Sequence, residues 1–155
     1  MTLEKPLIGW REWVTLPDLG IQHIKAKIDT GARTSALHAC RVADYFERGT
    51  HRVRFHIHPF QRRTDVVTQC DAEIIDRRWV RDSGGHRERR YVITTTVCLG
   101  PHTWPIEVTL TDRDSMLFRM LLGRTAISKR FTIDAGKSFR LGSPPRKDSH
   151  PDTSQ

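Results

Sequence analysis

Apolar and polar residues alternate with a period of two along much of the chain before about Leu141. In the segment 24–28, isoleucine, alanine and isoleucine alternate with two lysines, and the segments 52–58 and 106–110 repeat the pattern. Successive side chains of a strand point to opposite faces, so this period is typical of strands with one buried face. The segment 89–99 is rich in β-branched and aromatic residues, which suit a pleated surface. The pattern therefore predicts a mostly β protein.

Turn-forming residues interrupt this pattern and predict a hairpin. Between Trp79 and Tyr91, the segment 80–87 contains Asp-Ser-Gly-Gly and separates two extended arms. Only the segment 125–130, which follows a glycine and an arginine, has the character of a short helix. We therefore expect a β-barrel or β-sandwich with one short helix.

The length of the chain suits one domain, because 155 residues can enclose a core without disulfide or metal support. We assign residues 1–141 to this domain and expect residues 142–155, which are rich in serine, proline and charge, to form a disordered tail. No apolar run approaches the ~20 residues that span a bilayer, and the first six residues lack a signal pattern. The sequence therefore predicts a cytoplasmic protein without a membrane partner.

The cysteines do not suggest a disulfide framework or a zinc ribbon. Cys40, Cys70 and Cys98 are odd in number and lack CxxC spacing. We expect reduced thiols packed inside the protein.

The charge of the chain indicates an anionic partner. The 26 Lys+Arg residues exceed the 18 Asp+Glu residues and give a net charge of +8. Most of the cations are arginines, whose planar fork of donors matches carboxylate or phosphate groups. The chain has no helix-turn-helix, zinc-finger or RNP-type pattern, so we do not expect nucleic acid as that partner. A solvated basic surface would explain the same charge.

One carboxylate stands where an active site would need it. The apolar strand that ends at Ile28 leads directly into Asp29-Thr30-Gly31, so the carboxylate lies at a strand end beside a glycine that permits a tight turn. Taken alone, an ordinary Asx turn would explain this short motif equally well. A second element, Met120 to Arg124, follows about ninety residues later and consists of an apolar strand that ends in Gly-Arg.

These two motifs, in this order, resemble the retropepsin family. The segments 12–17, 24–39 and 120–124 are similar to a bacterial branch whose members carry the name ATP-dependent zinc protease, and the resemblance covers residues 8–141. It implies a closed acid-protease β-barrel that is active as a homodimer. Some members of this branch are associated with ligases that add glutamate to a ribosomal protein.

The resemblance also implies roles for individual residues. Asp29 of each subunit would supply half of a dyad that shares one proton, Thr30 would bond across this dyad, and Gly31 would bind the substrate backbone. The hairpin turn would form a flap over the substrate, and Arg124 would brace the active-site loop. The substrate-binding residues implied in this way are Ala32, Arg33, Ser83, Gly84 and Arg124.

The chain departs from the family pattern at Arg33, where retroviral relatives carry an acidic or amide residue. Arg124 thereby loses its obvious partner, and Glu12 is one candidate to replace it. Asp134, in the sequence Ile-Asp-Ala-Gly, is the one candidate for a second carboxylate within the same chain. Its neighbour Ala135 lacks the hydroxyl that Thr30 provides, so we favour the dyad shared between two subunits.

The residues do not support the metal and nucleotide in that family name. The chain lacks HExxH and the GxxxxGK[ST] loop, and the pairs His38 with Cys40 and His56 with His58 do not complete a ligand set at familiar spacing. We therefore expect no metal and no cofactor. Two alternatives stay open, a zinc-dependent hydrolase and a non-catalytic homodimeric module that binds acidic tails.

Arginines near the predicted site favour acidic, most plausibly glutamate-rich, substrates. Arg33 stands four residues after Asp29, and the arms of the predicted flap have more cations than anions. A cleft lined by cations concentrates anionic ligands, and salt weakens this effect. The arm cations are Arg77, Arg78, Arg81, Arg87, Arg89 and Arg90, and the arm anions are Asp76, Asp82 and Glu88.

Overall fold

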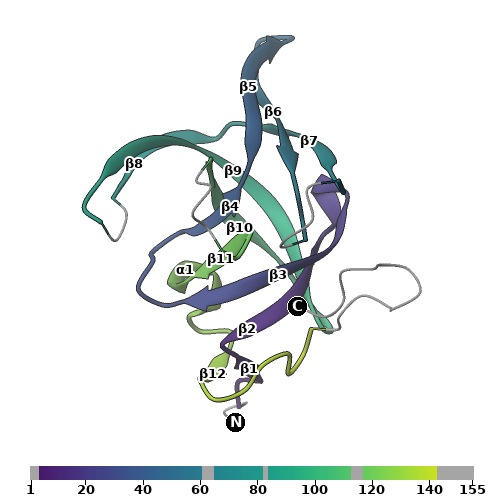
Figure 1. Cartoon of the computed structure of the whole chain (residues 1–155), viewed down its shortest axis with the longest axis vertical. Coiled ribbons are helices and arrows are strands. Elements are labelled where there is room, and N and C mark those ends of the chain that lie inside the picture. The colour runs from purple at the N-terminus through teal and green to yellow at the C-terminus, as the bar shows by residue number, and fades with distance from the viewer. Residues whose placement is uncertain (1–3, 61–64, 82–83, 113–116, 143–155) are drawn as a thin grey trace.

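The computed structural model describes residues 4–60, 65–81, 84–112 and 117–142. These residues form strands, one 3-10 turn (η1, Pro17–Leu19) and one α-helix (α1, Arg124–Ile127), so the fold is mostly β with one short helix, as predicted (Figure 1). The strands are β1 (Leu7–Gly9), β2 (Arg11–Leu16), β3 (Ile21–Asp29), β4 (Ser35–His38), β5 (Cys40–Glu47), β6 (Thr50–Ile57), β7 (Thr68–Glu73), β8 (Asp76–Arg81), β9 (Arg87–Leu99), β10 (His102–Thr111), β11 (Met120–Gly123) and β12 (Thr132–Asp134).

The strands form one large sheet and two small ones. The seven-stranded sheet has the order β10-β4-β11-β3-β2-β9-β8, and β9 pairs in addition with β10. The hairpins of β5–β7 make a separate three-stranded sheet, and β1 pairs with β12 in a parallel two-stranded sheet. In Figure 1, the β8–β9 hairpin and the end of β3 lie on the same side of the molecule.

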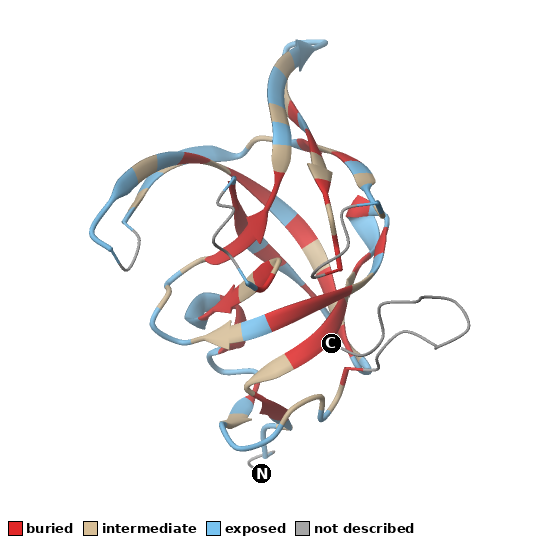
Figure 2. Ribbon diagram, viewed as in Figure 1, coloured by how far each residue is buried: buried red, intermediate tan, exposed pale blue. Residues whose placement is uncertain are grey.

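The predicted alternation is confirmed by burial. Ile24 and Ala26 in β3 and the apolar residues of β6 are fully buried, and most of the apolar residues of β10 are at most 5% exposed (Figure 2). Each large aliphatic side chain moved from water to the core contributes roughly 1.5–3 kcal/mol. The hydrophobic effect therefore determines which face of each strand turns inward. The polar side chains on the opposite face remain available for binding or catalysis.

Lys25 departs from this alternation. The pattern placed it on the solvated face of the strand, but its exposed fraction is only 3%. Its ammonium lies 5.3 Å from the ring centre of Trp13 and 5.9 Å from that of Phe139. The aromatic rings cover the apolar stem of the lysine and attract its charge. Residues distant in sequence thus bury a side chain that looks exposed.

The predicted hairpin is confirmed, while the helix is shorter than expected. Strands β8 and β9 pair in antiparallel register from Asp76 opposite Val92 to Arg81 opposite Arg87. The helix spans Arg124–Ile127 rather than residues 125–130. It ends because Ser128 has an extended ψ of 137° and Lys129 adopts a left-handed φ of 71°.

The chain after β12 folds back across β1 and β2, and one buried carboxylate holds it there. We call residues 137–142 the C-terminal strap. Glu12, which is fully buried, accepts hydrogen bonds from the backbone N–H groups of Gly9, Arg140, Leu141 and Gly142 at 2.7–3.0 Å. Glu12 is therefore committed to the strap and is not the partner that Arg124 was predicted to need.

The strap also revises one boundary of the predicted domain. Gly142 was assigned to the tail, but it is buried and its N–H donates to Glu12 at 2.8 Å. A Cβ atom at Gly142 would collide with the backbone of Trp13, so only glycine fits there. Residues 143–155, the rest of the predicted tail, lie outside the described residues. Within the described chain, no helix has the length and apolar character needed to cross a membrane.

Candidate active site

Asp29 ends strand β3, where the sequence predicted a carboxylate on a turn. Its neighbour in the sheet is Gly123, the last residue of the parallel strand β11. Gly31 donates its N–H to Asp29 Oδ1 at 3.1 Å, and Ala32 donates its N–H to the backbone carbonyl of Asp29 at 3.2 Å. These bonds hold the carboxylate in a half-exposed position, while Thr30 and Gly31 are exposed. A carboxylate held this way is accessible for proton transfer.

The segment after the turn is fastened to the start of α1. The N–H of Arg124 donates to the carbonyl of Ala32 at 2.8 Å, and Thr125 donates to the carbonyl of Arg33 through its N–H at 3.1 Å and its hydroxyl at 2.8 Å. The Arg124 guanidinium donates to the carbonyl of Gly31 at 3.3 Å. Arg124 therefore braces the loop through a backbone oxygen, and this contact needs no acidic side chain at position 33.

Gly123 allows β11 to approach this loop closely. A Cβ atom at this position would lie 2.7 Å from the carbonyl carbon of Thr34 and 2.9 Å from the carbonyl oxygen of Arg33. The N–H of Gly123 also donates to the hydroxyl of Ser35 at 3.1 Å. The Gly-Arg pair of the sequence motif thus has two structural tasks, close approach by Gly123 and bracing by Arg124.

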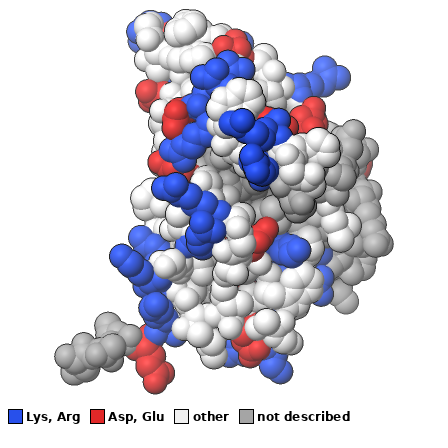
Figure 3. Space-filling view, turned by 90° about the vertical axis from the view of Figure 1, so that its left-hand side faces the viewer, with Lys and Arg blue, Asp and Glu red and all other residues white. Residues whose placement is uncertain are grey.

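A cleft of about 1200 Å³ lies between the Asp29 loop and the β8 arm of the hairpin. Figure 3 faces this side of the molecule, where lysine and arginine side chains gather beside a hollow. Of the predicted site residues, Asp29, Gly31, Ala32, Arg33 and Arg124 line the cleft. Thr30 and Gly84 are exposed and are not part of its described lining, and Ser83 lies outside the described residues.

Cations outnumber anions in this cleft. Its described lining contains the carboxylates of Asp29 and Glu107 and six cationic side chains. Arg78 and Arg90 form ion pairs, with Glu107 and Glu88 respectively. The four cations that make no ion pair with a described residue are Lys27, Arg33, Arg81 and Arg124.

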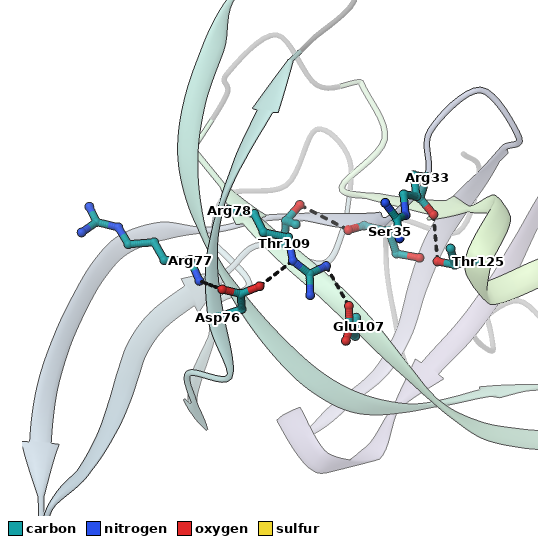
Figure 4. A network of polar contacts seen from close by, with 8 residues as sticks. All are labelled: Arg33, Ser35, Asp76, Arg77, Arg78, Glu107, Thr109 and Thr125. Atoms are coloured by element: carbon teal, nitrogen blue, oxygen red, sulfur yellow. Dashed lines mark hydrogen bonds and ion pairs between the residues drawn. The ribbon is translucent and has the colours of Figure 1, made fainter.

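Polar contacts connect the hairpin arm to the cleft wall (Figure 4). Arg78 on β8 lies between Asp76 and Glu107, with donor–acceptor distances of 2.7 Å and 2.8 Å. The pKa of Arg78 is raised by the hydrogen bonds to Glu107 and Asp76, and Arg78 in turn lowers the pKa of Asp76. The sequence interpretation counted Arg78 among the flap cations but missed Glu107 and Lys27. Both residues stand at polar positions of segments in which apolar and polar residues alternate, and this pattern was the sequence feature that could have indicated them.

Asp134 does not join Asp29 in the cleft. It belongs to β12, where it lies opposite Gly9 of β1 and forms a local turn through the N–H of Gly136 at 3.0 Å. It is not among the residues that line the cleft. The described part of one chain therefore presents a single Asp-Thr-Gly carboxylate, and Asp29 and Asp134 do not form a dyad within it.

The histidine and cysteine pairs considered as metal ligands do not gather into a site. In the described chain, no group of three or more His, Cys, Asp or Glu side chains is arranged to hold a metal ion. The Cys40 thiol instead donates to the carbonyl oxygen of His56 at 3.7 Å.

Comparison with known proteins identifies the family. Residues 7–143 match the family model RimB-like, described as "Retropepsin-like aspartic endopeptidase RimB". The chain belongs to this family. The match spans the Asp29 loop, the β8–β9 hairpin and the Gly123–Arg124 pair, so all the elements around the cleft fall within the RimB-like region.

Individual relatives of this RimB-like chain have a different name. A "Probable alpha-L-glutamate ligase" of Shewanella halifaxensis is 44% identical over 142 residues, which are 92% of this chain and 31% of the ligase. A protein with the same name from Desulfotalea psychrophila is 41% identical over 140 residues, 90% of this chain and 30% of the relative. The chain thus spans about a third of these curated relatives.

One solved structure is similar over nearly its full length. A Legionella pneumophila protein of unknown function matches with a TM-score of 0.73 and 26% sequence identity. The match covers 89% of this chain and 99% of the other. The RimB-like fold described above therefore occurs as a separate chain in a crystal structure.

Proposed function

We propose that this chain is an aspartic endopeptidase that acts as a homodimer through Asp29 of each subunit. The observation that supports it most directly is the position of Asp29, held at a strand end by Gly31 and facing a cleft below the β8 arm. The proposal includes a closed acid-protease barrel, which is supported by the pairing of β9 with both β10 and β2.

The chemistry of the proposed reaction needs two carboxylates. Two carboxylates a few ångströms apart share one proton, because like charges at that distance cannot both ionise. One of them accepts a proton from water while the other protonates the carbonyl oxygen of the scissile peptide bond. Asp134 lies elsewhere, so a second copy of Asp29 related by a two-fold axis is the source that we propose. Thr30, exposed beside it, would bond across this axis.

We further propose that the substrate is acidic and glutamate-rich. The support is the set of cleft cations that lack an ion pair within the described chain, above all Arg33 and Arg81. A cation in a cleft without a counter-ion attracts an anionic ligand and raises its association rate. The names of the relatives agree with glutamate as the shared chemistry. Ligase activity itself is not part of the proposal, because the chain matches only about a third of those proteins.

A second candidate is a non-catalytic homodimer that binds acidic tails. The same excess of cations in the cleft favours it, and so does the resemblance to one part of proteins named as glutamate ligases. The two candidates share the cleft and its ligand class, and they differ only in whether Asp29 transfers protons. The third candidate, a zinc hydrolase, lacks a described ligand cluster to support it.

The decisive experiment compares wild type with Asp29→Asn on glutamate-rich peptides and length-matched neutral peptides. We expect cleavage of the acidic peptides by wild type only, with the dimer retained in the variant by light scattering, because asparagine keeps the shape of the turn but cannot transfer the proton. Arg33→Ala and high salt should each reduce cleavage of the acidic peptides. Comparable turnover by Asp29→Asn would refute the catalytic assignment, and activity lost on exhaustive chelation would favour the zinc hydrolase.

A further inference from the structure

Two arginines stand directly opposite each other in the β8–β9 hairpin. Arg78 on β8 is the register partner of Arg90 on β9, and both line the cleft. Side chains at opposite positions of an antiparallel pair lie on one face with Cβ atoms about 5 Å apart, and like charges placed there destabilise the pair. Two like charges placed together at the wall of a cleft are a reason to ask which anionic groups neutralise them.

Each arginine forms ion pairs with carboxylates. Of the two carboxylates that bind Arg78, one lies in the cleft and the other lies outside it. Arg78 donates through Nε to Asp76 at 2.7 Å and through Nη1 to Glu107 at 2.8 Å. Glu107 lines the cleft, whereas Asp76 does not. Replacing Glu107 by another carboxylate from the cleft would leave the bond to Asp76 in place, so the guanidinium would keep its direction.

Arg90 is the more buried of the two, with 8% of its side chain exposed. It donates to Glu88 through Nε and to the hydroxyl of Thr109 at 3.4 Å. Thr111 donates its hydroxyl to the same oxygen of Glu88 at 2.7 Å, which fixes the counter-ion of Arg90. Arg90 therefore presents a fixed, poorly solvated positive charge beside the more exposed Arg78.

We propose that Arg78 and Arg90 together bind a side-chain carboxylate of the acidic substrate, and that Glu107 occupies Arg78 until this carboxylate replaces it. The inference rests on the proposed acidic substrate and names the groups that would recognise it. The exchange is inexpensive, because the side chains of Arg78 and Glu107 are 37% and 46% exposed and such a surface ion pair contributes little stability. Glu107 thereby competes with the substrate carboxylate for Arg78 and lowers the affinity for acidic peptides, whereas neutral peptides do not have to displace it.

The test measures peptide binding rather than cleavage. Binding of a fluorescent hexaglutamate and a hexaglutamine to the full chain with Asp29→Asn is followed by anisotropy, so the peptide stays intact. Arg78→Gln should weaken hexaglutamate binding by ~10- to 100-fold, the range expected for a hydrogen bond between charged groups, and should leave hexaglutamine unchanged. The matched control is Arg77→Gln, which has the same change of charge. Arg77 lies over the Tyr91 ring at 5.0 Å and is not in the cleft lining.

Glu107→Gln gives the opposite expectation and separates recognition from a structural role. Freed from its internal carboxylate, Arg78 should bind hexaglutamate several-fold more tightly, and Arg78→Gln with Glu107→Gln should bind like Arg78→Gln alone. Glu73→Gln, an exposed position on β7, is the matched control. A merely structural ion pair would make Glu107→Gln bind more weakly or unfold at lower temperature with no gain in binding.

The outcomes distinguish this inference from the proposed function. Hexaglutamate binding that is equal in Arg78→Gln and Arg77→Gln, or weakened by Glu107→Gln, overturns the inference while leaving the peptidase in place. Selective loss with Arg78→Gln supports it even where the wild type cleaves nothing, a result that would overturn only the peptidase. If circular dichroism shows that Arg90→Gln does not fold, the binding measurements on Arg78→Gln and Glu107→Gln still test the inference.

Discussion

Cys70 lies in the core with 6% of its surface exposed, and its thiol donates to the carbonyl oxygen of Leu19 at 3.5 Å. Burial raises the pKa of this thiol to about 12, because the apolar surroundings disfavour the thiolate. The thiolate is the reactive form of cysteine. Cys40 and Cys98 are only half-buried, so burial divides the three cysteines into two chemical classes.

Alkylation should reveal this difference. At pH 8, a Cys70 thiol whose pKa is raised in this way is almost entirely protonated. We therefore expect iodoacetamide to modify Cys40 and Cys98 well before Cys70 in the native protein, as read by mass spectrometry of peptides. In denaturant, all three should react alike. Modification of native Cys70 at the rate of Cys98 would show that the core around it opens readily.

The roles of some individual residues could be predicted from the sequence, and the roles of others could not. The motif pointed to Asp29 because a carboxylate after an apolar strand and before glycine is a local signal. The tasks of Lys25 and Glu12 were not predictable in this way, because part of what encloses each of them comes from a chain segment more than a hundred residues away. Arg33 was expected to weaken the role of Arg124, but the bond runs to a backbone carbonyl that every residue possesses.

At the scale of elements, the close approach of β11 to the loop 29–34 organises the site. Gly123 lies opposite Asp29 in the sheet and beside the backbone of Thr34. The order of strand, loop, hairpin and short helix was predictable, since each has a local pattern of apolar or turn residues. Outside the predicted hairpin, which strands pair was not predictable, because register depends on contacts such as this one between distant segments.

Gly123→Ala should therefore disturb both stability and the site. The added methyl would lie 2.7 Å from the Thr34 carbonyl carbon, so the loop must move. We expect a loss of roughly 1–3 kcal/mol in the free energy of unfolding, as for other overpacked positions, and a loss of peptide cleavage. Denaturant titration measures the first effect. Gly136→Ala is the control, because its nearest neighbour would be 3.5 Å away; equal stability of the two variants would contradict the role of close approach.

At the scale of the whole molecule, Glu12 joins the first strands to the last described residues. Its two carboxylate oxygens each accept two backbone N–H groups. A glutamine has one acceptor oxygen, and its NH₂ group would face N–H donors. Each buried donor left unsatisfied costs ~1–3 kcal/mol. Glu12 therefore holds the C-terminal strap together with two backbone bonds, from the Trp10 N–H to the Lys137 carbonyl and from the Phe139 N–H to the Arg11 carbonyl.

Glu12→Gln should lower the free energy of unfolding by ~2–6 kcal/mol, because two buried N–H donors lose their acceptor. It should also expose the strap, so that trypsin cuts after Lys137 and Arg140 faster than in wild type. Limited proteolysis with mass spectrometry measures the sites, and Glu47→Gln, an exposed position, provides the control. Unchanged cleavage in Glu12→Gln would mean that the remaining contacts, the packing of Phe139 on Trp13 and the bond from the Phe139 N–H to the Arg11 carbonyl among them, are enough to hold the strap.

The same carboxylate determines how mechanical load would enter the fold. Tension applied to the chain beyond Gly142 meets the bonds to Glu12 before it reaches β12, because the strap is fastened at Arg140, Leu141 and Gly142. The load would then pass into β2, and from there into β3, whose last residue is Asp29. A partner that pulls on this end would thus act, through β2 and β3, on the strand that ends at Asp29.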